Sequence, residues 1–182
     1  QNFVAGMMLL IERTIKPGDV LEVEDRVVKV EAMGIRSTIA RSRDGEQVII
    51  PNQVLVGSTF KNYTLKDAYY RMQVSVGVTY NSDMKQVRAV LEGVAAKIAA
   101  KWGVDTHSPI VVMAGFGDNA VEFKMAIWMS DPWHWFPAVN ELHEGIWWAF
   151  KEAGIVIAFP QLDVHFDPPI SESIRGLGNI AV

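Results

Sequence analysis

The chain has 182 residues, of which 49% are hydrophobic and 21% charged, a composition typical of folded proteins and sufficient for one medium domain or two small ones. Its 17 basic and 21 acidic side chains give a net charge of −4, which argues against a large phosphate-binding surface because nucleic-acid affinity depends largely on neutralised phosphates. The chain contains no cysteine, which excludes disulfides, cysteine-rich zinc sites and thiol nucleophiles within it.

An apolar run from Phe3 to Ile11 lies at the start of the chain. It is too short to span a bilayer, whose hydrocarbon core requires about 20 helical residues. It also lacks the basic region and the cleavage site of a signal peptide. Composition alone leaves two interpretations open, namely a buried or amphipathic first helix and the end of a membrane helix.

Short extended segments follow Pro17-Gly18, a pair that breaks helices. We predict five strands, near 19–24, 27–33, 36–42, 46–50 and 55–63. Asp44-Gly45 suits the tight hairpin turn between the third and fourth of them. Five short strands in so little sequence favour closure into a small, strongly bent barrel.

The second half of the chain has a different pattern, beginning at Tyr70. Alternation of apolar and polar residues predicts strands near 70–79, 110–114, 121–129, 155–158 and 162–166. A helix is predicted to start after the N-cap pair Ser82-Asp83 and to end at Gly103. A second helix is predicted to cover about 137–153, with Gly154 ending it. The resulting order, β-α-β-β-α-β, is that of a ferredoxin-like domain.

The predicted fold class is therefore α+β. Its parts are a short N-terminal helix at 1–13, a five-stranded Sm-like β-barrel at 14–67, a ferredoxin-like domain at 68–167 and a C-terminal tail at 168–182.

No group of residues in the sequence predicts catalysis. His143 and Glu144 are adjacent on the second predicted helix, so their side chains point in different directions and do not have the spacing of a metalloprotease helix. The segment Gly115-Phe116-Gly117-Asp118 joins two strands, whereas a phosphate-binding loop precedes a helix. We therefore expect no enzyme, no metal site and no cofactor.

A dense aromatic cluster lies in and before the second predicted helix: Trp133, Trp135, Phe136, Trp147 and Trp148. We expect it to fill a core and a subunit interface, where large aromatic side chains contribute most. The alternative is stacking on bases or sugars. Arg36, Arg41 and Arg43 are the basic cluster of the barrel region, and nearby acidic residues dilute it, so RNA binding is the weaker interpretation.

Short motifs in a fixed order carry a resemblance to a known family. In the barrel region they are Ile15-Lys16-Pro17-Gly18-Asp19, Met33-Gly34-Ile35-Arg36-Ser37-Thr38, Asp44-Gly45, Val48-Ile49-Ile50-Pro51-Asn52 and Asn62-Tyr63. Later motifs are Tyr80-Asn81-Ser82-Asp83, Gly117-Asp118-Asn119-Ala120-Val121 and Phe159-Pro160-Gln161. Each motif is weak alone, but the ordered set closely resembles the small-conductance mechanosensitive ion channel family over essentially residues 1–167.

The resemblance implies a subunit of a tension-gated homo-oligomer, usually a heptamer, in the bacterial inner membrane. Residues 1–13 would be the end of the pore-lining transmembrane helix, and the full-length parent would contact the lipid bilayer. The two following domains would face the cytoplasm and form the vestibule through which ions and small solutes pass during osmotic downshock. The alternative is a stand-alone, ring-forming, Sm-like RNA-binding protein.

The same resemblance implies residues that couple the pore helix to the domains below it. Ala5 and Gly6 are small and would let neighbouring helices approach closely. Asn2 would hydrogen-bond towards the barrel loop at Pro51 and Asn52.

Overall fold

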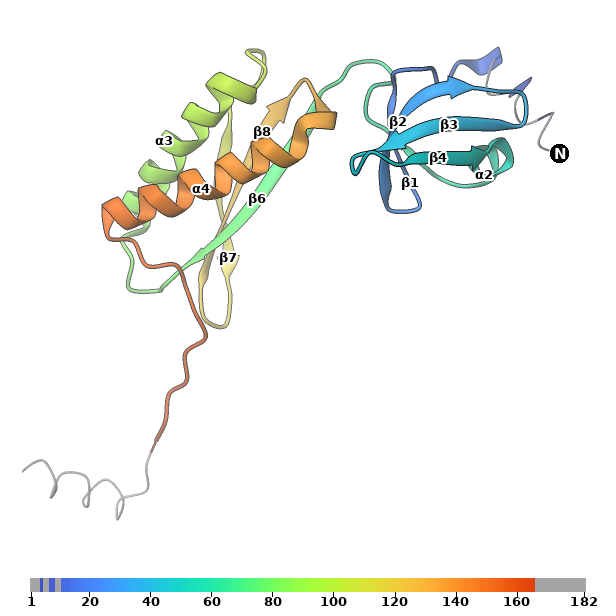
Figure 1. Cartoon of the computed structure of the whole chain (residues 1–182). Coiled ribbons are helices and arrows are strands. Elements are labelled where there is room, and N and C mark those ends of the chain that lie inside the picture. Colours follow the sequence, from blue (N-terminus) through green and yellow to red (C-terminus); the bar gives the residue numbers. More distant parts are fainter. Residues whose placement is uncertain (1–3, 5–6, 9–10, 166–182) are drawn as a thin grey trace, which may run out of the picture.

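The computed structural model describes residues 4, 7–8 and 11–165 (Figure 1). Two hydrophobic clusters form within them, one among the first five strands and one between the later strands and helices. We call the part made by strands β1 to β5 and helix α2 the β unit, and the part made by strands β6 to β8 and helices α3 and α4 the α/β unit.

The β unit is built on one antiparallel sheet with the order β4-β3-β2-β1-β5. Its strands are β1 (Val20–Val23), β2 (Arg26–Met33), β3 (Ser37–Ser42), β4 (Gln47–Pro51) and β5 (Lys61–Asn62). Alternate side chains of these strands point inward, as the period of two in a strand requires. They form a core with side chains from the flanking loop and helix α2: Ile15, Leu21, Val23, Val28, Val30, Ala40, Ile50 and Leu55.

One predicted strand of the β unit is partly wrong. Helix α2 (Asn52–Gly57) occupies the start of the segment 55–63, and only Lys61–Asn62 is a strand. Leu55 on α2 is almost completely buried, so the segment contributes to the core as a helix. Among the described residues no pairing joins β4 to β5, because the two-residue β5 pairs only with β1. The closed Sm-like barrel therefore stays a prediction.

The α/β unit has a second antiparallel sheet, with the order β6-β8-β7. Its strands are β6 (Tyr70–Val78), β7 (Ile110–Phe116) and β8 (Val121–Met129). Helices α3 (Met84–Trp102) and α4 (Trp135–Ala153) pack against this sheet and against each other (Figure 1). A short 3₁₀ helix, η1 (Pro132–His134), precedes α4.

The predicted helix ends are confirmed in two places. The Asp83 carboxylate accepts hydrogen bonds from the Lys85 and Gln86 N–H groups at the start of α3, as an N-cap residue does. Gly154 has a φ of 68° after α4, a left-handed conformation that glycine adopts without a steric cost. Sequence signals for capping were therefore reliable in this unit.

The two strands predicted after α4 do not form within the described residues. Ile157 makes an isolated bridge to Val78, and the Ala158 N–H donates to the Gly77 carbonyl at 2.9 Å. Beyond that point Leu162 is 86% exposed, so the apolar face of the predicted strand has no sheet to cover it. The mixed α+β fold with antiparallel sheets is confirmed, whereas the ferredoxin-like arrangement stays a prediction, and residue 166 and the tail lie outside the described residues.

Candidate functional site

Pro51 and Asn52, which the family resemblance placed in a barrel loop, form the corner where β4 passes into α2. The Asn52 side chain is fully buried, and its Oδ1 accepts a hydrogen bond from the Thr38 hydroxyl at 2.9 Å. Its Nδ2 donates to the carbonyls of Gly34 and Ile35 at 3.0 and 3.1 Å. The side chain of Asn52 is thus used to hold the β2–β3 loop against the start of α2.

The other predicted coupling residues, Asn2, Ala5 and Gly6, lie outside the described residues. Nearby, the helical residues Val4, Met7, Met8 and Ile11 are described, and all four are exposed. No helix in the described part of the chain is long and apolar enough to cross a membrane.

A second buried polar cluster, centred on Asp19, joins the start of the β unit to its end. The Asp19 carboxylate, only 1% exposed, accepts hydrogen bonds from the Lys16 N–H, the Asn62 amide and the Thr64 hydroxyl at 2.9 to 3.0 Å. Asn62 also donates to the Thr14 carbonyl at 3.0 Å. These hydrogen bonds, which we call the Asp19 clasp, hold the segment before β1 against the segment that follows β5 and leads to the α/β unit.

Beside this clasp, Glu22 on β1 accepts hydrogen bonds from Lys61, at 2.6 Å, and from the Tyr63 hydroxyl. The Lys61 and Tyr63 hydrogen bonds hold the pKa of Glu22 below its usual value. Burial and the carboxylate of Glu22 raise the pKa of Tyr63, so this hydroxyl stays protonated and remains a donor. The Tyr63 ring also meets the Tyr70 ring edge to face, with centroids 5.1 Å apart.

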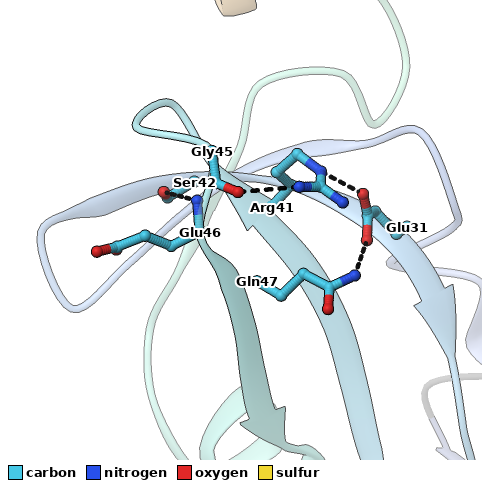
Figure 2. Close-up of polar contacts among 6 residues, drawn as sticks. All are labelled: Glu31, Arg41, Ser42, Gly45, Glu46 and Gln47. Atoms are coloured by element: carbon cyan, nitrogen blue, oxygen red, sulfur yellow. Dashed lines mark hydrogen bonds and ion pairs between the residues drawn. The ribbon is translucent and has the colours of Figure 1, made fainter.

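The turn between β3 and β4 is braced by side chains at its base (Figure 2). Arg41 Nε lies 2.6 Å from Glu31 Oε1, and Arg41 Nη1 donates to the Gly45 carbonyl at 2.9 Å. Gly45 has a φ of 89°, and the Ser42 N–H donates to the Glu46 carbonyl at 2.8 Å. The predicted hairpin turn at Asp44-Gly45 is confirmed, and it places Arg43 at its tip.

Arg43 reaches from the tip of this turn to the α/β unit. Its Nη2 donates to the Pro132 carbonyl at 2.7 Å. Its guanidinium carbon lies 5.9 Å from the centroid of the Trp133 ring and 5.6 Å from that of Trp135. The sequence had indicated Arg43 only as a member of a diluted basic cluster.

The acceptor side of this contact is fixed by Asp131. Its carboxylate accepts from the Trp133 N–H at 2.9 Å and lies 2.5 Å from His134 Nδ1. Burial by itself raises the pKa of Asp131, but the hydrogen bonds from His134 and Trp133 outweigh it and hold the pKa below the usual value. An ionised Asp131 thus caps η1 and positions the Pro132 carbonyl.

Of the aromatic cluster, Trp135 packs against the core of the α/β unit, as expected. Phe136, Trp147 and Trp148 are more than half exposed, and Trp133 and Trp135 are partly buried. The core assignment is therefore wrong for the first three, because α4 buries its other face, which carries Leu142, Ile146 and Phe150. The subunit-interface assignment stays a prediction.

A second exposed apolar surface lies on β7. This strand is at the edge of its sheet, and Ile110, Val112, Met113 and Phe116 are all exposed. An edge strand with unpaired backbone groups and apolar side chains is a template for association with another chain.

Family models match both parts of the chain. The model described as mechanosensitive ion channel, beta-domain, matches residues 1–65, and the model described as mechanosensitive ion channel MscS, C-terminal, matches residues 72–157. The chain belongs to the MscS family of mechanosensitive ion channels. The predicted family resemblance is thereby confirmed.

Individual MscS-family proteins resemble the chain along most of its length. It is 32% identical to the mechanosensitive channel MscK of Escherichia coli over 166 residues, which are 90% of this chain and 14% of that protein. It is 28% identical to the small-conductance mechanosensitive channel MscMJ of Methanocaldococcus jannaschii over 174 residues, 92% of this chain and 48% of that protein. The chain thus spans less than two thirds of the length of these relatives.

The fold also matches solved MscS-family structures. The closed state of Helicobacter pylori MscS superimposes with a TM-score of 0.80 at 26% identity, covering 91% of this chain and 64% of that one. Arabidopsis thaliana MSL1, at 12% identity, has a TM-score of 0.63 over 87% of this chain and 58% of its own, and shows the shared fold alone. These homologues are channels, which is consistent with the expectation that this MscS-family chain is not an enzyme.

Proposed function

We propose that the chain is part of a subunit of a tension-gated ion channel of the bacterial inner membrane. The β unit and the α/β unit, with boundaries at 14–67 and 68–167, are its cytoplasmic domains. They form the vestibule through which ions and small solutes pass during osmotic downshock. The observation that carries this proposal is the match of both units, in the same order, to the closed channel of H. pylori.

The start of the chain supports the assignment of residues 1–13 to the end of a pore-lining helix. Val4, Met7, Met8 and Ile11 are helical, apolar and exposed. Burying apolar side chains of this kind contributes about 1.5–3 kcal/mol each, so neighbouring helices or lipid would stabilise this segment. Within that helix, Ala5 and Gly6 would pack closely against a neighbour, and Asn2 would hydrogen-bond towards the corner at Pro51 and Asn52.

The activity itself requires no chemistry from this chain. A channel opens under tension because its open state occupies more membrane area, which biases an equilibrium between two conformations. Coupling of that equilibrium to the cytoplasmic domains requires that the corner between β4 and α2 does not deform. The buried hydrogen bonds of Asn52 hold this corner in place.

We further propose that copies of the chain assemble as a ring, seven by family resemblance. The exposed apolar residues of β7 and the exposed Trp147 and Trp148 of α4 are suited to contacts between subunits, since aromatic side chains are enriched at interfaces. RNA binding is not favoured, because Arg41 pairs with Glu31 and Arg43 contacts Pro132.

A chimera tests the proposed function. The cytoplasmic region of H. pylori MscS is replaced by residues 14–182 of this chain and expressed in bacteria that lack their own mechanosensitive channels. We expect tension-activated currents in membrane patches and improved survival of osmotic downshock. The matched control is the unmodified H. pylori channel at equal membrane abundance. An assembled, membrane-inserted chimera without tension-activated current would contradict the proposal.

A further inference from the structure

The contact made by Arg43 joins two units that otherwise leave open space at this point. On one side of Arg43 a cleft of about 810 Å³ lies between the two hairpin turns of the β unit and the start of α4, and Arg26, Trp133 and Phe136 also line it. On the other side a pocket of about 160 Å³ is lined by Tyr63, Tyr70 and Trp135. Arg43 thus bridges the units across a gap and is not embedded in a packed interface.

Hydrogen bonds hold both ends of this bridge in place. At the β unit, Arg41, Glu31 and Gln47 brace the base of the turn that carries Arg43 (Figure 2). At the α/β unit, Asp131 caps η1 and so fixes the carbonyl that Arg43 binds. Together with the chain that connects β5 to β6, a contact between two such points limits the angle between the two units.

The chemistry of the contact requires arginine. A guanidinium is planar, so it can donate to a carbonyl in its plane while its faces lie against aromatic rings. Arg43 does both, towards Pro132 and towards Trp133 and Trp135. A lysine at this position would keep the charge but would lose the planar, directional part of the contact.

We propose that Arg43 is a positioning residue that sets and stiffens the orientation of the β unit relative to the α/β unit, with the segment between Tyr63 and Tyr70 as the hinge. Releasing Arg43 lets the units rotate about the segment between those two tyrosines. Neither unit loses core packing when this happens, because Arg43 belongs to neither core.

The orientation of the β unit relative to the α/β unit can be measured in the 182-residue chain by the distance between two spin labels. Since the chain contains no cysteine, spin labels can be attached specifically at Ile49→Cys on β4 and Lys97→Cys on α3, both exposed positions. We expect Arg43→Ala to broaden the distribution of distances between the two labels about twofold, because orientations that the Arg43 contact disfavours become populated. Arg43→Lys should broaden the distribution less. The matched control, Arg36→Ala, changes an exposed arginine of the same unit that sits at another turn, and should leave the distribution unchanged.

The Trp133→Ala variant separates a positioning role from a general loss of structure. It should broaden the distribution in the same direction, and the double variant with Arg43→Ala should be no broader than Arg43→Ala alone, because both changes remove one contact. Thermal unfolding should be the same in all variants. Superimposable distributions for Arg43→Ala and Arg36→Ala would overturn the inference.

The consequence for gating rests on the proposed function and has its own measurement. In the chimeric channel, Arg43→Ala should change the rate at which current decays under sustained tension, and Arg36→Ala should not. An unchanged rate would overturn the link to gating. A chimera that never conducts would contradict the proposed function, while the spin-label distances would still decide the role of Arg43.

Discussion

The two units of this chain are stabilised in different ways. All four buried polar side chains among the described residues lie in the β unit: Asp19, Thr38, Ser42 and Asn52. The α/β unit instead has a larger apolar core between its sheet and two helices, and it carries the exposed apolar surfaces on β7 and α4. The β unit therefore fixes loops by directional hydrogen bonds, and the α/β unit combines a stable core with surfaces suited to association.

The largest expected effect tests the apolar core of the α/β unit. Leu91 on α3 is fully buried, so Leu91→Ala removes apolar contacts and leaves a cavity. We expect a loss of about 3 kcal/mol in the free energy of unfolding, within the range of 2–5 kcal/mol for such changes. The same substitution at the exposed Leu162 should change stability by less than about 0.5 kcal/mol. Chemical denaturation measures both, and equal effects would contradict the assignment of the core.

A somewhat smaller effect tests the polar corner of the β unit. Asn52→Ala leaves the Thr38 hydroxyl and the carbonyls of Gly34 and Ile35 without their buried partner. We expect a loss of about 2–3 kcal/mol, because unsatisfied buried polar groups keep their full desolvation cost. Asn140→Ala, at an exposed asparagine of α4, is the control. A loss below that of Asn140→Ala would show that the corner is not held by this side chain.

A substitution in a turn of the β unit should increase the free energy of unfolding by about 1 kcal/mol. Glu24 and Asp25 both have positive φ, 49° and 62°, in the two-residue turn between β1 and β2, which favours glycine or asparagine. Asp25→Gly should stabilise the chain by up to about 1 kcal/mol, and Gly45→Ala should destabilise it by about 1 kcal/mol or more, because alanine is strained at the positive φ of Gly45. A destabilising effect of Asp25→Gly in thermal unfolding would contradict this account.

The apolar surface of β7 is tested by self-association of the chain, which Val112→Lys should weaken. A charge on an exposed edge strand opposes pairing with another chain. Sedimentation of the wild-type chain and the variant at equal concentration measures the difference. Lys29→Glu, at an exposed position of β2 in the β unit, is a charge-changing control. An unaltered sedimentation profile for Val112→Lys, in a wild-type chain that self-associates, would remove β7 from the interface.

The smallest effect is a pH dependence in the β unit. Lys61 and Tyr63 lower the pKa of Glu22 in the folded chain, so the unfolded state takes up a proton first on acidification. This stabilisation is present above the usual glutamate pKa of about 4.3–4.5 and is lost as the pH falls through the lower folded value. Unfolding curves at pH 7 and at acidic pH should therefore differ more for the wild-type chain than for Glu22→Gln. Equal differences would show that the carboxylate is not stabilised in its charged form.

Local signals in the sequence were reliable wherever a short segment decides its own conformation. The hairpin at Asp44-Gly45, the N-cap at Asp83 and the C-cap at Gly154 were all predictable, since each depends on the conformational preference of one or two residues. The segment 55–63 was not, because its apolar residues fit a strand or a buried turn of helix equally well. Its place beneath the sheet, with Leu55 in the core, decided in favour of the helix.

The candidate functional site shows the same difference between features that depend on a short segment and features that depend on distant residues. The motif order determined the family, and the family resemblance directed attention to Pro51-Asn52, whose coupling role stays a prediction. The clasp of Asp19 and the bridge of Arg43 could not, because each joins residues more than forty positions apart, and a sequence pattern carries no information on such distances.

The sequence by itself thus determined the family, the α+β composition and the turns and caps, because these depend on residue preference and on motifs with a fixed order. Only the tertiary structure decided which polar residues are buried, which aromatic side chains remain exposed, and that Arg43 reaches Pro132. The physical reason is that burial and long-range hydrogen bonds depend on how distant segments meet, which the packing of the whole chain sets.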